Sequence, residues 1–105
     1  MKTQDQARLK ARADVIKAMG HPSRLHILEL LADGERCVCE LHREVGSDLS
    51  TVSRHLTVLK HAGLVADRRE GTNIHYRLVA PCTTRFMDCV DSMLKANAKR
   101  QAALL

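Results

Sequence analysis

Two cysteines separated by one residue are the feature of this sequence with the sharpest chemistry. Cys37 and Cys39 stand in the stretch Cys-Val-Cys-Glu-Leu. Soft thiolates prefer soft, thiophilic ions, whereas carboxylate sites do not. In a regular α-helix, side chains two residues apart point to nearly opposite sides. Both sulfurs can therefore hold one ion only if the segment is extended or the first helical turn is distorted, and we expect ion capture to reshape the start of the following helix.

The other two cysteines, Cys82 and Cys89, allow two interpretations. They are seven residues apart, about 10 Å along a helix, which is too far to chelate one ion within a straight helix. Both fall on an apolar stripe, so they could equally be small buried hydrophobic residues. The N-terminus lacks the apolar region of a signal peptide, so we expect a cytoplasmic protein. Thiols stay reduced there, and the four cysteines are then ligands, sensors or core residues rather than a disulfide framework.

The segment after the cysteine pair predicts a helix-turn-helix. A first helix should cover about 38–45, Gly46 and Ser47 form the turn, and Asp48 is a good N-cap for a second helix over about 49–62. Gly63 stands where a left-handed C-cap is needed.

The second helix has two different faces. Val52, Leu56 and Leu59 fall on one inward stripe. Hydrogen-bonding side chains crowd its first two turns, as in a DNA-recognition helix whose N-terminal residues reach base edges in the major groove. The predicted base-reading residues are Ser50, Thr51, Ser53, Arg54 and His55. The alternative is a solvated polar face on an ordinary helical hairpin.

A β-hairpin should follow the recognition helix, over about 65–79. Residues 64–65 and 74–79 favour strands, and the polar, turn-rich stretch 67–73 forms a basic tip between them. A hairpin in this place is a wing, and its polar residues are expected to hold flanking phosphates or the minor groove. These residues are Arg68, Arg69, Asn73 and His75. For each arginine the alternative is a solvated surface charge.

Three more helices are predicted around this motif. A first amphipathic helix should cover about 5–19, and an apolar helix over 23–32 should be the central buried one. The last helix, over about 81–104, carries an apolar stripe that is too large to leave in water on so short a chain. The first and last helices together therefore predict a dimer interface.

The length indicates one small domain, residues 1–105, and the predicted elements make it mainly α-helical with a small β-hairpin, a winged helix-turn-helix. The chain has 105 residues, and its net charge of +5 suits a polyanionic partner such as double-stranded DNA. No apolar run is long enough to span a membrane. The sequence lacks C-x-x-C, H-E-x-x-H and a glycine-rich phosphate loop, so we do not expect an enzyme.

Four segments together resemble the ArsR/SmtB family of metal-sensing bacterial transcriptional repressors. They are A-M-G-H-P-S-R-L-H-I-L at 18–28, C-V-C-E-L at 37–41, S-T-V-S-R-H-L-T-V-L-K-H-A-G-L-V at 50–65 and D-R-R-E-G-T-N-I-H-Y-R-L at 67–78. The resemblance implies a homodimeric winged helix-turn-helix that binds operator DNA and leaves it when an inducer binds. It makes trivalent arsenic or antimony at Cys37 and Cys39 the leading inducer, with cadmium, lead or zinc behind.

The chain departs from the arsenic sensors it resembles at one position. Those proteins have a third cysteine shortly after the pair, where this chain has His42. Imidazole is a good ligand for zinc and a poor one for trivalent arsenic. A third ligand could be Cys82 or Cys89, from either subunit, with His42 less favoured. Two other functions remain open: a repressor controlled by thiol oxidation, and a winged-helix module that binds protein.

Overall fold

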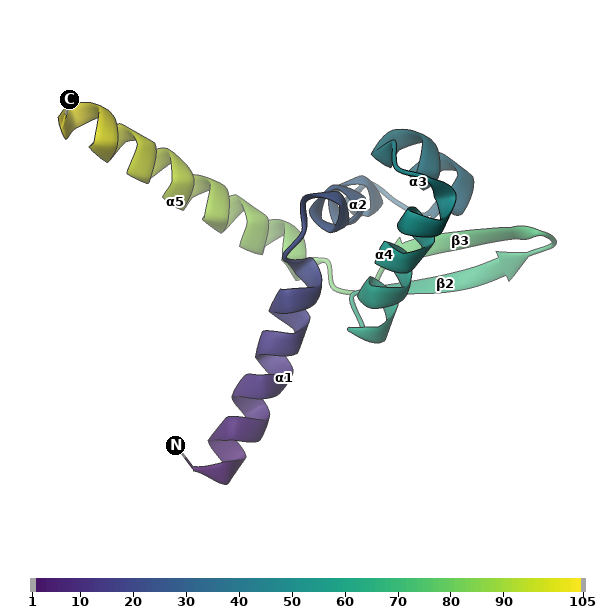
Figure 1. The fold of residues 1–105 in the computed structure, drawn as a ribbon, viewed down its shortest axis with the longest axis horizontal. Helices are drawn as coiled ribbons and strands as arrows, with labels where there is room; N and C mark the ends of the chain where they lie inside the picture. The colour runs from purple at the N-terminus through teal and green to yellow at the C-terminus, as the bar shows by residue number, and fades with distance from the viewer. Residues whose placement is uncertain (1, 105) are drawn as a thin grey trace.

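The computed structural model describes residues 2–104, and they form a small body from which two long helices project (Figure 1). The elements in order are α1 (Thr3–Met19), α2 (Pro22–Ala32), β1 (Arg36–Cys37), α3 (Val38–Val45), α4 (Leu49–His61), β2 (Val65–Glu70), β3 (Asn73–Leu78) and α5 (Cys82–Leu104). The predicted fold, mainly helical with a β-hairpin after a helix-turn-helix, is confirmed. No described helix is both long enough and apolar enough to cross a membrane.

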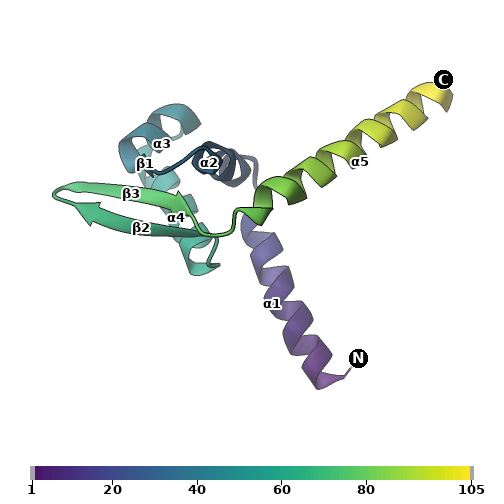
Figure 2. The same ribbon diagram turned by 180° about the vertical axis from the view of Figure 1, so that it is seen from behind.

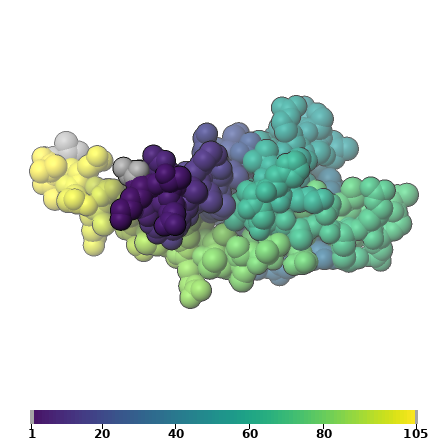
Figure 3. Space-filling view, turned by 90° about the horizontal axis from the view of Figure 1, so that it is seen from below, coloured from purple at the N-terminus to yellow at the C-terminus, as the bar shows by residue number. Residues whose placement is uncertain are grey.

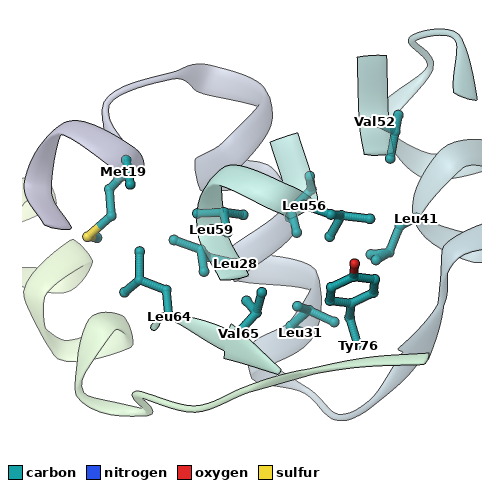
Figure 4. Packing of buried hydrophobic residues seen from close by; sticks show 12 residues of the cluster. Met19, Leu28, Leu31, Leu41, Val52, Leu56, Leu59, Leu64, Val65 and Tyr76 are labelled. Atoms are coloured by element: carbon teal, nitrogen blue, oxygen red, sulfur yellow. The ribbon is translucent and has the colours of Figure 1, made fainter. Parts of the chain in front are cut away.

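The core is aliphatic and lies where α2, α3 and α4 meet the sheet (Figure 4). The three residues of the predicted α4 stripe, Val52, Leu56 and Leu59, are all buried. α2 adds three buried side chains, as expected of a central helix, and Tyr76 closes the core from β3. The full buried apolar cluster comprises Ala18, Met19, Ile27, Leu28, Leu31, Leu41, Val52, Leu56, Leu59, Leu64, Val65 and Tyr76.

Local signals set the ends of the helix-turn-helix. Gly46 adopts a left-handed φ of 81°, which glycine does without a steric penalty, and the chain turns there. The Asp48 carboxylate accepts the backbone N–H of Thr51 at 2.7 Å and so caps α4. The predicted bounds of α3 are confirmed, and α4 ends at His61, one residue before the prediction.

The sheet is larger than the sequence suggested. Its strand order is β1-β3-β2, and all pairs are antiparallel. β1 was not predicted, because it is only two residues long and exists through its pairing with Tyr76 and His75 of β3. β2 and β3 extend to a two-residue turn at Gly71 and Thr72. The expectation of a long polar tip over 67–73 is therefore wrong, and Arg68 and Arg69 lie within a strand.

α1 and α5 project from the body (Figures 1 and 2), and both helices carry exposed apolar side chains. In Figure 3 they form one end of the molecule, and the wing (β2, β3 and their turn) forms the other. Ile16 on α1 is 56% exposed, and Met93 and Leu94 on α5 are 55% and 56% exposed. Leu9 and Phe86 are also exposed large hydrophobic residues. Folding of one chain therefore leaves the two predicted dimerisation helices with uncovered apolar faces.

The predicted DNA contact at His55 is wrong. The side chain is only 7% exposed, and its Nδ1 accepts a hydrogen bond from Arg24 Nε at 3.1 Å. Arg24 also donates to the carbonyl oxygen of Ala18 at 3.3 Å, so His55 helps to tie α4 to α1 and α2. The reason is helical spacing: position 55 completes the i, i+3, i+4, i+7 pattern with the three inward residues of α4.

His55 is held neutral by this environment. Burial lowers the pKa of His55 below its ordinary value, and nearby His21, Arg24 and Arg54 lower it further. The His21 ring lies 4.5 Å from the His55 ring, measured between centroids. Because Nδ1 accepts the bond from Arg24, the proton of the neutral ring is on Nε2.

We expect the free energy of unfolding to fall as the solution becomes acidic. A lowered pKa in the folded state means that the unfolded chain takes up the His55 proton first as pH drops, below about pH 6.5. The stability that neutral His55 contributes is thus present above that pH and lost as pH falls toward its folded pKa. Urea denaturation from pH 8 to pH 5 should show a steeper acid loss for wild type than for His55→Asn. Equal slopes would contradict this assignment.

Candidate nucleic-acid interface and thiol site

The exposed face of α4 carries the side chains available for contacts outside the domain. Ser50, Ser53, Arg54 and Thr57 are exposed, and Thr51 is half-buried. Two of the hydroxyls already have partners, since Ser50 Oγ donates to Asp48 at 2.9 Å and Thr57 Oγ1 donates to the Ser53 carbonyl at 2.9 Å. Arg54 brings a full charge and a fork of N–H donors, the group best suited to a guanine edge.

The two faces of the wing differ in charge. Residues directly opposite in an antiparallel pair share a face, so Asp67 and Arg69 lie with Tyr76 and Ile74 on one face. Lys60 of α4 binds Asp67 at 3.0 Å, which identifies this face as the one toward the recognition helix. We call it the front of the wing. Arg69 is thus on the same side of the molecule as α4.

The back of the wing carries Arg68, Glu70, His75 and Arg77, which alternate with the front residues. Arg68 is already occupied there: its Nε and Nη2 donate to Glu35 Oε1 at 2.8 and 2.6 Å, and its Nη1 donates to Glu70 Oε2 at 2.8 Å. Hydrogen bonds from Arg68 hold the pKa values of Glu35 and Glu70 below their ordinary range, so both carboxylates stay charged.

The predicted phosphate-binding set is therefore divided. Arg69 lies on the front of the wing, and Asn73 borders the turn at the end of the wing. Arg68 and His75 lie on the back, where His75 Nε2 is 3.7 Å from Glu70 and His75 Nδ1 is 4.0 Å from Glu35. Local sequence could not reveal this division, because it depends on Glu35 approaching from the loop before β1.

The backbone at the cysteine pair is extended on one side, which is the conformation that two cysteines at this spacing need to bring their sulfurs together. Cys37 ends β1 in an extended conformation, with φ −75° and ψ 157°, and Cys39 follows in the first turn of α3. The two Cα atoms are 5.3 Å apart, and the sulfurs form a disulfide bond. The expectation that these thiols are free is wrong for this state of the protein, because the extended residue removes the helical separation of the side chains.

Cys37 also caps the helix that follows it. Its Sγ accepts the backbone N–H of Glu40 at 3.2 Å, and Glu40 Oε1 accepts the backbone N–H of Cys37 at 3.4 Å. The two residues form a capping box with sulfur in the place of the usual hydroxyl oxygen. Chemistry at this sulfur therefore acts directly on the start of α3.

A groove of about 490 Å³ joins the cysteine pair to both candidate DNA-binding elements. α3 contributes its cysteine end and His42, α4 forms a second wall, and the wing forms the third. The lining residues are Cys37, Val38, Cys39, His42, Leu49, Ser53, Leu56, Thr57, Thr72, Asn73, Ile74 and Tyr76. Cys37 is 7% exposed and Cys39 is exposed, so a small solute can reach the pair from one side.

Of the other proposed ligands, His42 lines this groove and the two remaining cysteines do not. Cys82 and Cys89 lie on α5, are free thiols and are exposed, so they are not core residues of the single chain. Within residues 2–104, no three cysteine, histidine or carboxylate side chains are already gathered as a metal site.

Comparison with known proteins agrees with this architecture. Residues 21–67 match the family described as bacterial regulatory protein, arsR family. The HTH-type transcriptional regulator Rv0081 of Mycobacterium tuberculosis is 44% identical over 97 residues, covering 91% of this chain and 85% of that one. The arsenic resistance transcriptional regulator ArsR2 of Pseudomonas putida is 33% identical over 87 residues, covering 82% of this chain and 76% of its own length.

A solved structure is similar over nearly the whole length. It is the homodimeric winged helix-turn-helix DNA-binding domain of Mb0332 from Mycobacterium bovis, with a TM-score of 0.80 and 36% identity. The match covers 95% of this chain and 93% of the other. With the arrangement of α3, α4 and the wing, these similarities show that the chain belongs to the ArsR family of bacterial transcriptional regulators.

Proposed function

We propose that the protein is a homodimeric repressor that binds double-stranded operator DNA and releases it when a thiophilic ion binds Cys37 and Cys39. The observation that carries the proposal is the shared groove, in which the cysteine pair, α4 and the wing meet. The leading inducers are trivalent arsenic and antimony, with cadmium, lead or zinc as alternatives. A regulator of arsenic resistance is among the relatives.

The DNA-binding part of the proposal rests on the exposed face of α4. This helix enters the major groove, where Arg54 meets a guanine edge and Ser50, Thr51 and Ser53 contact bases or backbone. Arg69 and Asn73 on the wing contact flanking phosphates. The chain's net charge of +5 supports attraction to DNA.

Replacing Arg54 with alanine should weaken DNA binding roughly tenfold to a hundredfold, as expected for loss of a bidentate base contact. The probe is a duplex that the wild-type protein enriches from a random-sequence DNA library. Fluorescence anisotropy at several salt concentrations gives both the affinity and its salt dependence. The matched control is Arg100→Ala on α5, an exposed arginine whose side chain donates a hydrogen bond to Asn97; this variant should leave affinity unchanged.

The same titration tests DNA binding itself. Affinity for the enriched duplex should fall steeply with salt, because each phosphate contact releases counterions. Failure to enrich any duplex, or an affinity indifferent to salt, would instead favour a winged-helix module that binds protein.

The homodimer is supported by the apolar faces of α1 and α5. Phe86, Met93 and Leu94 lie on one side of α5 and are about half exposed. A second copy of the chain can cover these faces, as the homodimeric state of the Mycobacterium bovis domain suggests. Two α4 helices related by a two-fold axis then reach major grooves one helical turn apart, roughly 34 Å.

The double variant Phe86→Glu/Leu94→Glu should shift the protein from dimer to monomer, because two buried charges oppose association. Analytical ultracentrifugation over a range of concentrations measures the change. Lys95→Glu, on the opposite side of the same helix, is the matched control and should leave the dimer intact. A wild-type protein that sediments as a monomer at high concentration would contradict the proposed assembly.

Induction is proposed to start at the capping sulfur. When the pair is reduced, two thiols displace two hydroxyl groups of arsenous acid as water, and two As–S bonds replace two As–O bonds. Cys37 Sγ then no longer caps α3 in the same way, and α3 supports α4. DNA release follows if the ion-bound conformation has lower affinity for the operator. A third ligand, Cys82 or Cys89 of either subunit or His42, would complete the site.

A second candidate function uses the same residues. The disulfide between Cys37 and Cys39 favours a repressor that responds to oxidants. In that reaction the two thiols lose two protons and two electrons, and hydrogen peroxide accepts them to give two water molecules. The disulfide would then set the position of α3 without any ion.

Titrations of the reduced protein bound to the enriched duplex separate the two functions. Under anaerobic conditions, arsenite, antimonite, cadmium and zinc are added in turn, and peroxide is added separately. We expect arsenite or antimonite to release wild type and the control Cys82→Ser/Cys89→Ser, but not Cys37→Ser/Cys39→Ser. Release of the Cys37→Ser/Cys39→Ser variant would overturn the site, and release by peroxide alone, reversed by dithiothreitol, would establish the redox function. Loss of response only in Cys82→Ser/Cys89→Ser would place the primary site on α5.

A further inference from the structure

The back of the wing holds a cluster of charges that DNA contact does not explain. Arg68 on β2 lies between Glu35, in the loop before β1, and Glu70 on its own strand. His75, the residue opposite Arg68, approaches both carboxylates. Arg77 lies on the same back face, and its charge also acts on Glu35. We name Glu35, Arg68, Glu70 and His75 the back cluster.

We propose that Glu35 is a positioning residue that fixes the wing against the β1 segment through Arg68. The guanidinium of Arg68 then binds carboxylates of its own chain and does not bind phosphate. The inference rests on the proposed DNA-binding function. It assigns the wing's phosphate contact to Arg69 on the front face.

Charge balance is the first support for this assignment. The carboxylates of Glu35 and Glu70 both bind Arg68, and with Arg77 on the same face the two arginines and two carboxylates sum to zero, so this face has no excess positive charge from them to attract a phosphate. To reach DNA, Arg68 would have to give up both carboxylates. Its planar guanidinium donates hydrogen bonds to Glu35 and Glu70 at the same time, which a lysine ammonium group cannot reproduce in this geometry.

Connectivity is the second support. Glu35 directly precedes β1, and β1 pairs with β3 through Arg36 opposite Tyr76 and Cys37 opposite His75. The Glu35 contact to Arg68 spans from this segment across β3 to β2, so it joins all three strands. The wing is otherwise a two-stranded ribbon beyond this point, and such ribbons are marginally stable alone. A contact at Glu35 therefore sets the angle at which the ribbon leaves the body.

The test relies on two explanations that predict opposite changes in DNA affinity when the Glu35 charge is removed. Removing a negative charge beside a DNA-binding wing should strengthen DNA binding if only long-range electrostatics matters. If Glu35 positions the wing, Glu35→Gln should instead weaken binding to the enriched duplex by roughly twofold to fivefold, the range for loss of a surface ion pair. Asp33→Asn is the matched control, since it removes the same charge two residues earlier, and it should bind as wild type or slightly more tightly.

Arg68→Lys and the salt dependence distinguish positioning from phosphate contact. A lysine keeps the charge, so affinity should persist if position 68 binds phosphate, but it should fall as in Glu35→Gln if the fork between two carboxylates is needed. The slope of log affinity against log salt should stay unchanged in Arg68→Gln and should decrease by about one in Arg69→Gln.

The measurements separate the positioning role of Glu35 from DNA binding itself. Glu35→Gln binding as tightly as Asp33→Asn, or a lower salt slope in Arg68→Gln, would overturn the positioning role while leaving DNA binding by α4 intact. Loss of the proposed function would appear separately, as wild type that does not bind the enriched duplex or as Arg54→Ala that binds like wild type.

Discussion

The change of chain direction at Cys37 is the constraint on which the rest of the candidate site depends. This residue is the last of a strand and the N-cap of a helix at the same time. Its backbone belongs to the sheet that contains the wing. Its sulfur accepts a hydrogen bond from the backbone N–H of Glu40 in the first turn of α3. One residue is thereby bonded to both halves of a winged helix-turn-helix, and a reaction at its sulfur cannot leave either half unaffected.

In the proposed mechanism, two routes connect the cysteine pair with the DNA-binding elements. One runs through α3 to α4, whose packing is part of the common aliphatic core. The other runs through the pairing of β1 with β3 to the wing, with the contact between Glu35 and Arg68 as a second link. Surface ion pairs are individually weak, so the second route depends on the backbone pairing together with the two hydrogen bonds that Arg68 donates to one oxygen of Glu35.

The sequence predicted what local chemistry determines. Asp48, Gly46 and the stripe of Val52, Leu56 and Leu59 define the helix-turn-helix within a short window, and these elements were placed almost to the residue. β1 has no local signal, since two residues become a strand only beside β3.

The errors in the candidate site have the same origin. Helical spacing already puts His55 with the inward residues of α4, but its hydrogen-bond partner Arg24 is 31 residues away and has no local signal. Arg68 looks like a phosphate ligand until Glu35, 33 residues away, is placed beside it. Contacts between distant parts of the chain decide which polar residues have partners within the fold, and a pattern of residue types does not contain those contacts.

The projecting helices have a consequence for how such a regulator works in a cell. Most of α1 and α5 touches nothing within one protomer, so the free energy of covering them is gained only on association. Where monomers predominate, dimer abundance varies with the square of total protein, so halving the amount of chain leaves about a quarter of the dimers. The copy number of the protein thus sets how much of the chain is present as the dimer, and doubling the amount of chain has a more than proportional effect.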